Sequence, residues 1–250
     1  MQLGAMSWTA LRERLDEGPL DVAVPLGALE QHGPHLPLDT DSRIAVAVAT
    51  RAAERVGRCV VAPPQAVGAS AHHLAFPGTA SLTDRTLADV LVEVTHTLLS
   101  HGFRAAYLVT GHAGNVGAMA DALASLAEPD RGRVVAFNDW PAQRDAVHRV
   151  AETRCGLDRE TCGTHAGHFE TSILLAIAPE SVTMGAAVPG HVGPPEEAGA
   201  VLRAGGMDAL SPVGVIGDPR GATASAGELY LEALVDLIAG GIAAHREAHP

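Results

Sequence analysis

The chain has 250 residues, 47% of them hydrophobic and 18% charged, which suffices for one domain with a substantial core. All 17 basic residues are arginines, against 29 Asp and Glu, and the formal net charge is −12. The absence of lysine excludes a lysine Schiff base and a Walker phosphate loop, and the acidic balance argues against nucleic-acid and membrane-surface binding. We expect no membrane span and no secretory signal, and therefore a cytoplasmic protein, because a long apolar run and a basic start are both missing.

Cysteine and histidine usage narrows the chemistry. The three cysteines, Cys59, Cys155 and Cys162, are an odd number in a long chain and predict free thiols in a reducing compartment. A regulatory disulfide between Cys155 and Cys162 is the alternative. The 13 histidines are the compositional anomaly, and they direct attention to metal binding or proton transfer.

The first part of the chain alternates short apolar runs with longer helical stretches. The apolar runs predict strands over residues 21–27, 59–63, 105–110 and 133–138. The stretches between them predict helices over about 41–56, 83–100 and 115–126. Asp41 or Ser42 is expected to cap the first of these helices, and Thr83 or Asp84 the second. This alternation predicts an α/β fold, a three-layer α/β/α sandwich with a mainly parallel sheet.

The second part is less regular. Residues 140–162 are charged and predict a helix, and residues 171–178 read equally well as a buried helix or a strand. Residues 185–197, rich in Gly and Pro, predict an excursion from the domain, and residues 226–246 an amphipathic helix. With no repeat or linker in the sequence, residues 1–250 are expected to form a single domain, with Trp8 in its core.

Ionisable side chains gather where the predicted strands end. Glu30 and His32 follow the first strand, Asp41 stands a little further on, and His112 follows the third strand. The segment 164–172 adds further imidazoles and a carboxylate. Since the loops after parallel strands share one edge of the sheet, we expect these groups to lie at one site.

Imidazole and carboxylate together are the ligands expected for Zn, Mn or Fe(II), and no cysteine lies in these motifs to suggest a thiolate site. Glu30 and His32, two residues apart, project to the same side of an extended backbone. That spacing suits two ligands of one cluster, or one ligand for each of two adjacent ions. The alternative is a polar loop network in which the histidines cap helices.

The same motifs carry a family resemblance. Residues 24–49, VPLGALEQHGPHLPLDTDSRIAVAVA, resemble the opening motif of the creatininase (creatinine amidohydrolase) family. The resemblance continues, in the family's order, through segments 68–79, 110–115, 165–172 and 211–224. It implies an α/β/α amidohydrolase with two divalent metal ions, a homohexamer that cleaves a C–N bond of a small-molecule amide by metal-activated hydroxide.

The resemblance also implies a ligand set. Glu30, Asp41 and His112 would surround one metal ion, and His32 and Asp41 the second, with Asp41 bridging the two. Asp39 is the competing bridge, but the family's spacing after Glu30 favours Asp41. The ions would be Zn, Mn or Fe.

One block departs from creatininase itself, which carries an aromatic residue and a Glu where this chain has Ala113 and Gly114. The second metal ion then lacks a carboxylate, and Glu170 is the predicted replacement. The lost aromatic residue weakens the case for creatinine. The loop resembles those of formamidopyrimidine deformylases and the mycofactocin-precursor peptidase, which gives two alternative activities. An inactive, metal-stabilised binding or assembly protein is the non-enzymatic alternative.

Further residues are candidates for catalysis and substrate binding. His165 is the first choice for transferring a proton to the leaving nitrogen, because imidazole titrates near neutral pH. His168 is the alternative, although a supporting or surface role suits it at least as well. Ser70 and His73 are expected to hold the substrate, against a purely structural turn, and Trp140 to form a pocket wall, against ordinary packing.

Overall fold

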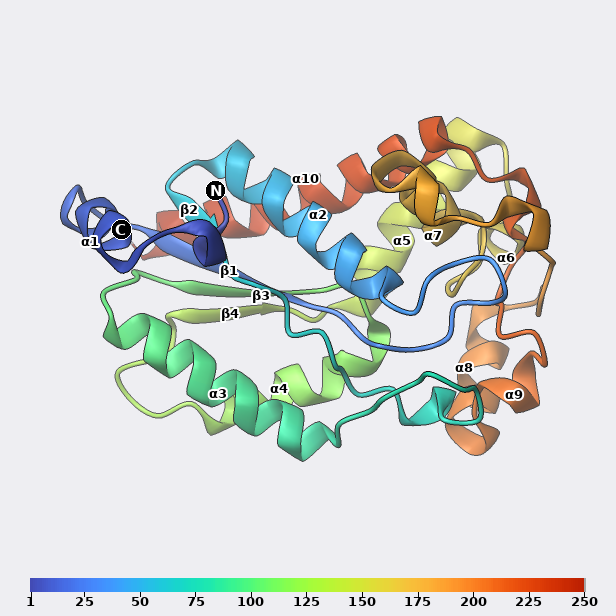
Figure 1. Cartoon of the computed structure of the whole chain (residues 1–250), viewed down its shortest axis with the longest axis horizontal. Helices are drawn as coiled ribbons and strands as arrows, with labels where there is room; N and C mark the ends of the chain where they lie inside the picture. The colour runs from blue at the N-terminus through green and yellow to red at the C-terminus, as the bar shows by residue number, and fades with distance from the viewer. Residues whose placement is uncertain (250) are drawn as a thin grey trace.

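The computed structural model describes residues 1–249, which form a parallel sheet between two layers of helices (Figure 1). The strands are β1 (Asp21–Leu26), β2 (Cys59–Val61), β3 (Ala106–Thr110) and β4 (Val134–Phe137). They are hydrogen-bonded in the order β2-β1-β3-β4, and every pairing is parallel. The predicted three-layer α/β/α fold is confirmed.

Helices cover both faces of the sheet. One face carries α2 (Thr40–Val56), α5 (Trp140–Val150), α7 (His168–Ile177) and α10 (Ala224–Ala248). The other carries α3 (Asp84–Ser100) and α4 (Val116–Ser125).

The strands supply each core from alternate residues. Ala23, Tyr107 and Val109 belong to the hydrophobic cluster beneath α2 and α10, whereas Val22 and Leu108 belong to the cluster beneath α3 and α4. This alternation follows from the two-residue repeat of a strand, in which successive side chains point to opposite faces. A sheet covered on both sides needs apolar residues at both, which explains the uninterrupted apolar runs in the sequence.

Small elements gather at the carboxyl edge of the sheet. The helices α8 (Pro195–Gly205) and α9 (Met207–Leu210) lie at the end of the molecule opposite α1 (Trp8–Asp16) (Figure 1). Buried Met207 anchors them by packing with Ala198 and Ile216. The sequence predicts the excursion that leads into α8, but not these two helices.

The structure decides one open alternative and corrects two predictions. Residues 171–177 belong to a helix, α7, and not to a strand. The expected helix over 140–162 is interrupted after Val150 by a π-helical turn, followed by the short α6 (Arg159–Cys162). Trp8 is 79% exposed, on a helix that has no fully buried residue, so its placement in the core is wrong.

The start of α2 also differs from expectation. The helix begins at Thr40, so that Asp39 is its first flanking residue, and Asp41 and Ser42 lie buried inside the first turn. The side chain of Asp41 is thereby free to face the interior. The Thr83 cap is confirmed, since its hydroxyl accepts the Thr86 backbone N–H at 3.2 Å.

Two predictions from composition can also be checked. All three cysteines are free thiols, so the proposed Cys155–Cys162 disulfide is not formed. Within residues 1–249, no helix is long and apolar enough to cross a membrane.

The packing of α10 on α7 yields a first prediction. A Cβ added at Gly227 of α10 would overlap the backbone carbonyl of Ser172 in α7, so Gly227→Ala should destabilise the fold by about 1–3 kcal/mol. Gly240 of the same helix has open space at its Cβ position, and Gly240→Ala should stabilise by about 0.5–1 kcal/mol. Urea unfolding of both variants measures the difference, and equal midpoints would contradict this account of the helix contact.

Candidate metal centre

The carboxyl edge of the sheet holds a buried cluster of carboxylates and imidazoles. Its members come from the loop after β1, the first turn of α2, the loop after β3 and the start of α7. All five predicted ligands take part, and none is more than 4% exposed: Glu30, His32, Asp41, His112 and Glu170. The topology explains the convergence, because parallel strands end at one edge and the helices that follow begin there.

The first trio is Glu30, Asp41 and His112, each of which offers an atom within 4.8 Å of the others. Glu30 Oε2 lies 3.2 Å from His112 Nε2, and Asp41 Oδ2 lies 3.3 Å from His112 Nδ1.

The second trio is His32, Asp41 and Glu170. His32 Nε2 lies 3.1 Å from Asp41 Oδ1 and 3.7 Å from Glu170 Oε2. Asp41 therefore belongs to both trios and turns one carboxylate oxygen toward each. Asp39, its competitor as a bridge, lies at the surface instead and pairs with Arg43 at 2.8 Å.

A third overlapping trio consists of Glu30, His32 and His165. His165 Nδ1 lies 3.7 Å from Glu30 Oε1, and its Nε2 lies 2.9 Å from the backbone carbonyl of Gln31. Nε2 also lies 3.0 Å from the Gln31 side-chain amide nitrogen, so it faces both an acceptor and a donor of Gln31. His165 thus presents Nδ1 at the site.

The orientation of His32 tests whether a cation fits here. Its Nδ1 donates to the Glu30 carbonyl at 3.1 Å, which leaves the lone pair on Nε2 in the neutral ring. Nε2 then faces carboxylate oxygens of Asp41 and Glu170, so that three acceptors converge on one small volume. Metal-ligating histidines share this arrangement, in which a carbonyl fixes one nitrogen and the other faces the ion.

Carboxylate oxygens without hydrogen-bond partners also indicate a cation site. Both carboxylate oxygens of Glu30, and Oδ2 of Asp41, are buried and have no hydrogen-bond partner among the described residues. Buried anionic oxygens are costly unless a charge or donor compensates them. A divalent ion at each of the first two trios would compensate these oxygens, so the residues present fit metal ions.

The electrostatic state of the cluster follows from its burial. Burial and the neighbouring Asp41 carboxylate raise the pKa of Glu30 well above its usual range, and burial alone raises that of Asp41. Burial likewise raises the pKa of Glu170 to about 7 and lowers the pKa of His112 to about 3. In the protein without ions, burial therefore disfavours both the ionised carboxylates and the protonated imidazoles. A bound cation favours the ionised carboxylates again.

The backbone around the cluster is specialised. A side chain at Gly114 would overlap the ring of His112 and the carbonyl of Ala69, so the loop after β3 has no room for the Glu that creatininase carries there. Ala166 adopts a left-handed backbone (φ +50°) and donates its N–H to Glu170 Oε2 at 2.6 Å. Such strain is concentrated at functional sites, and here it orients the Glu170 carboxylate.

His73 and Ser70 lie around Glu30. Gln31 extends its amide nitrogen to His73 Nδ1 at 2.9 Å, and His73 Nε2 lies 3.3 Å from Glu30 Oε1 without forming a hydrogen bond. His73 lines the cavity described below, as predicted for a substrate-binding residue, but its ring is already engaged. Ser70 is fully buried, its hydroxyl has no hydrogen-bond partner among the described residues, and it is not among the described residues that line the cavity.

His168, the alternative proton carrier, is not brought to the cluster. Its Nδ1 lies 3.0 Å from the Tyr230 hydroxyl, and its Nε2 lies 3.1 Å from the Gly221 carbonyl. With both nitrogens engaged between α7 and α10, His168 has a structural role, and its predicted catalytic role is not supported.

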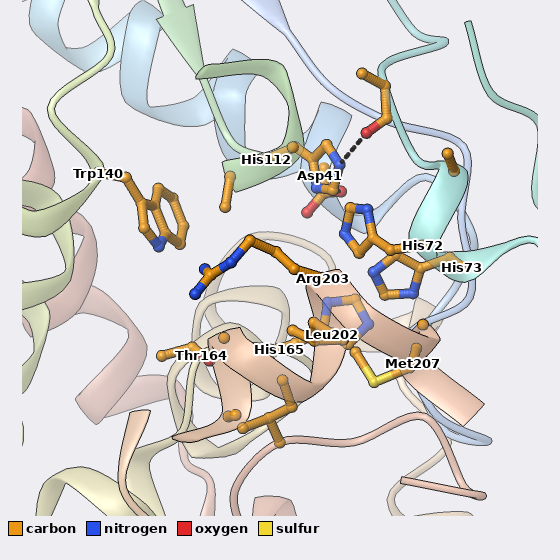
Figure 2. A pocket seen from close by; sticks show the side chains of 18 of the residues that line it. Asp41, His72, His73, His112, Trp140, Thr164, His165, Leu202, Arg203 and Met207 are labelled. Carbon is orange, nitrogen blue, oxygen red and sulfur yellow. Dashed lines mark hydrogen bonds and ion pairs between the residues drawn. The ribbon is translucent and has the colours of Figure 1, made fainter. Parts of the chain in front are cut away.

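A cavity of about 1330 Å³ opens over the cluster (Figure 2). Asp41, His112 and His165 reach it, and the predicted wall residue Trp140 and Thr164 also line it. The helices α8 and α9 add Leu202, Arg203 and Met207.

Three residues of this site were not identified from the sequence. The position of Gln31 between two candidate ligands could have identified it from the sequence. His72, whose ring centroid lies 5.6 Å from that of His112 in a stacked arrangement, could have been identified from its position next to His73. Arg203 could not have been identified in this way, because nothing in its segment predicts α8.

A buried carboxylate–imidazole cluster at the carboxyl edge of a parallel sheet, open to a large cavity, is typical of hydrolases that use metal ions. The family model described as creatinine amidohydrolase matches residues 4–242, and the chain belongs to this creatininase family.

Individual relatives agree with this assignment. The mycofactocin precursor peptide peptidase of Mycolicibacterium smegmatis is 40% identical over 220 residues, covering 86% of this chain and 81% of the relative. The creatinine amidohydrolase of Pseudomonas putida is 32% identical and covers 99% and 97%. A solved structure described as "Creatininase Mn" superimposes with a TM-score of 0.77 at 30% identity, covering 99% and 98%. The chain is thus a creatininase-family hydrolase of C–N bonds.

Proposed function

We propose that the chain is a binuclear metal-dependent amidohydrolase whose substrate is a peptide. The observation that carries the binuclear proposal is Asp41, which turns one oxygen toward each of two adjacent ligand trios. A carboxylate that turns its two oxygens toward separate ligand trios is expected between two ions, and a single ion would not account for this arrangement.

The first trio would hold one ion and the second trio the other, with Zn, Mn or Fe as candidates. Solved relatives are described as "Creatininase Mn" and, for a variant, as "Zn-Zn type", which supports the first two. When bound, such a pair of ions lowers the pKa of a water toward 7 and polarises a carbonyl group.

The chain's own residues orient the ligands and move the proton. The Glu30 carbonyl fixes the His32 ring, and His73 Nε2 lies 3.3 Å from the Glu30 carboxylate. His165 presents Nδ1 to the cluster, and its position suits it to pass a proton to the leaving nitrogen of the amide, although burial lowers the pKa of its ring.

The cavity favours a peptide over creatinine. Its volume of about 1330 Å³ exceeds the roughly 300–1,000 Å³ usual for drug-sized ligands, and creatinine would fill little of it. The higher identity to peptide peptidases, 40% against 32% for the creatinine amidohydrolase, supports the same choice. The small-molecule amide that the family resemblance implies is the other outcome of the test.

That test compares substrates directly. The metal-loaded protein would be incubated with acetylated hexapeptides randomised at the last two positions, with creatinine and with a formamidopyrimidine, and products followed by mass spectrometry. We expect cleavage of peptides and no turnover of creatinine. Turnover of creatinine or the formamidopyrimidine without peptide cleavage would refute the peptidase assignment but leave the amidohydrolase proposal intact.

The bridge is tested by two neighbouring aspartates. Asp41→Asn should remove at least one metal equivalent and lower activity by at least about 100-fold, because an amide offers one weak neutral acceptor in place of two anionic oxygens. Asp39→Asn, at the surface beside Arg43, should retain metal and substantial activity. Metal analysis and turnover measure both, and an equal loss of metal in the two variants would disprove the bridge.

Glu170 requires a separate experiment, since it also accepts the Ala166 N–H at the start of α7. As a ligand, Glu170→Gln should cost about one metal equivalent and most of the turnover while the fold persists. As a helix-terminal carboxylate only, it should cost under about 1 kcal/mol of stability and leave metal content unchanged. Glu160→Gln, in the first turn of α6, is the matched control.

The remaining expectations stay predictions. A single domain, a cytoplasmic location and the homohexamer that the family resemblance implies accompany this proposal as its expected setting.

A further inference from the structure

The cavity over the cluster has two arginines in its wall, and the proposed chemistry uses neither. Arg144 comes from α5 and Arg203 from α8, elements far apart in the sequence. Figure 2 shows Arg203 reaching across the cavity, with its guanidinium group on the side of Trp140 and Thr164.

These two arginines differ from those that stabilise the fold. Arg104 and Arg246 both pair with buried Asp21, at 2.7 and 2.8 Å. By contrast, Arg203 has no carboxylate within 4 Å among the side chains that the structure describes. Arg144 has only a 3.8 Å contact with the adjacent Asp145.

Of the two arginines, Arg144 gives the stronger evidence for a ligand. Its Nε is buried, so that water does not reach it, and it has no hydrogen-bond partner within the described part of the chain. A buried N–H donor without a partner is costly unless a ligand completes it, although 25% of the Arg144 side chain remains exposed. An arginine exposed to solvent, such as Arg149 on the same helix, carries no such cost.

The acidic residues Asp84 and Asp208, which also line the cavity, do not neutralise the two arginines. Asp84 lies near His72, whose pKa it raises against the larger lowering by burial. Asp208 lies in the first turn of α9 and makes no ion pair with Arg203 within 4 Å. The wall formed by α5 and α8 therefore offers positive charge near the cluster in a chain of net charge −12.

We propose that Arg144 and Arg203 form a subsite for an anionic group of the substrate, and that they orient the scissile amide toward the cluster. This proposal adds a chemical class of substrate to the proposed function, and it rests on that function only in taking the cluster as the active site. A guanidinium group binds carboxylate or phosphate through two parallel hydrogen bonds. For a peptide substrate, the anion is the C-terminal carboxylate, and the cleaved bond lies close to that end.

Binding of matched probes tests the subsite without turnover. Dansyl-tetraalanine and its C-terminal amide would be titrated against the full chain, metal-loaded and EDTA-treated, by fluorescence anisotropy. We expect the free acid to bind about 10- to 100-fold more tightly than the amide in both preparations. Competition by adenosine 5′-monophosphate, with adenosine as its control, distinguishes phosphate from carboxylate as the preferred anion.

Variants then locate the effect. Arg203→Gln and Arg144→Gln should each abolish most of the preference for the free acid, Arg203→Lys should retain part of it, and Arg149→Gln should leave it unchanged. Arg203 is exposed, so its variants keep the test meaningful if Arg144→Gln fails to fold.

Three results would overturn the subsite: no preference for the acid, a preference that disappears when metal is removed, or a preference that survives both Gln substitutions. A retained preference in a protein that cleaves no peptide would support the subsite and refute the peptidase assignment instead.

Discussion

Three carboxylates, Glu30, Asp41 and Glu170, are buried within one cluster, and no arginine in residues 1–249 makes an ion pair with any of them. Burying even one unpaired carboxylate is expensive, and like charges at short range add to the cost. The neighbouring histidines offer little relief, because burial holds the rings of His112 and His165 neutral. Bound divalent cations would compensate these carboxylates, because neutral imidazoles and ionised carboxylates together bind metal ions.

The sheet determines where this cluster forms, and the helices determine how firmly it is held. The loops after β1 and β3 bring their ligands to one edge, but Glu170 reaches the cluster only because α7 begins there. The position of α7 in turn depends on its close contact with α10, where Gly227 lets the two backbones approach. A residue distant from the cluster thus contributes to its geometry.

The sequence predicted the parallel sheet and the residues that converge at its edge, because strand periodicity and strand ends are local signals. It failed where tertiary contacts decide. Both nitrogens of His168 are engaged by Tyr230 and Gly221, residues far away in the sequence, and nothing in its own motif foretells this. Trp8 appeared apolar enough for the core, yet α1 lies at the surface. Hydrophobicity alone does not determine which apolar residues the fold covers.

The cluster and the rest of the cavity wall lie on different parts of the fold. The cluster is built from strand ends and the first turns of helices, which all members with this sheet can share. Part of the cavity wall comes from the family motifs, and the rest comes from α5, α8 and α9, whose residues those motifs do not include. With Gly114 too crowded for a side chain, the third carboxylate comes from α7 rather than from the loop after β3, and that loop lies open to the cavity. The proposed preference for an acidic peptide over creatinine rests on this large cavity and on the arginines in its wall.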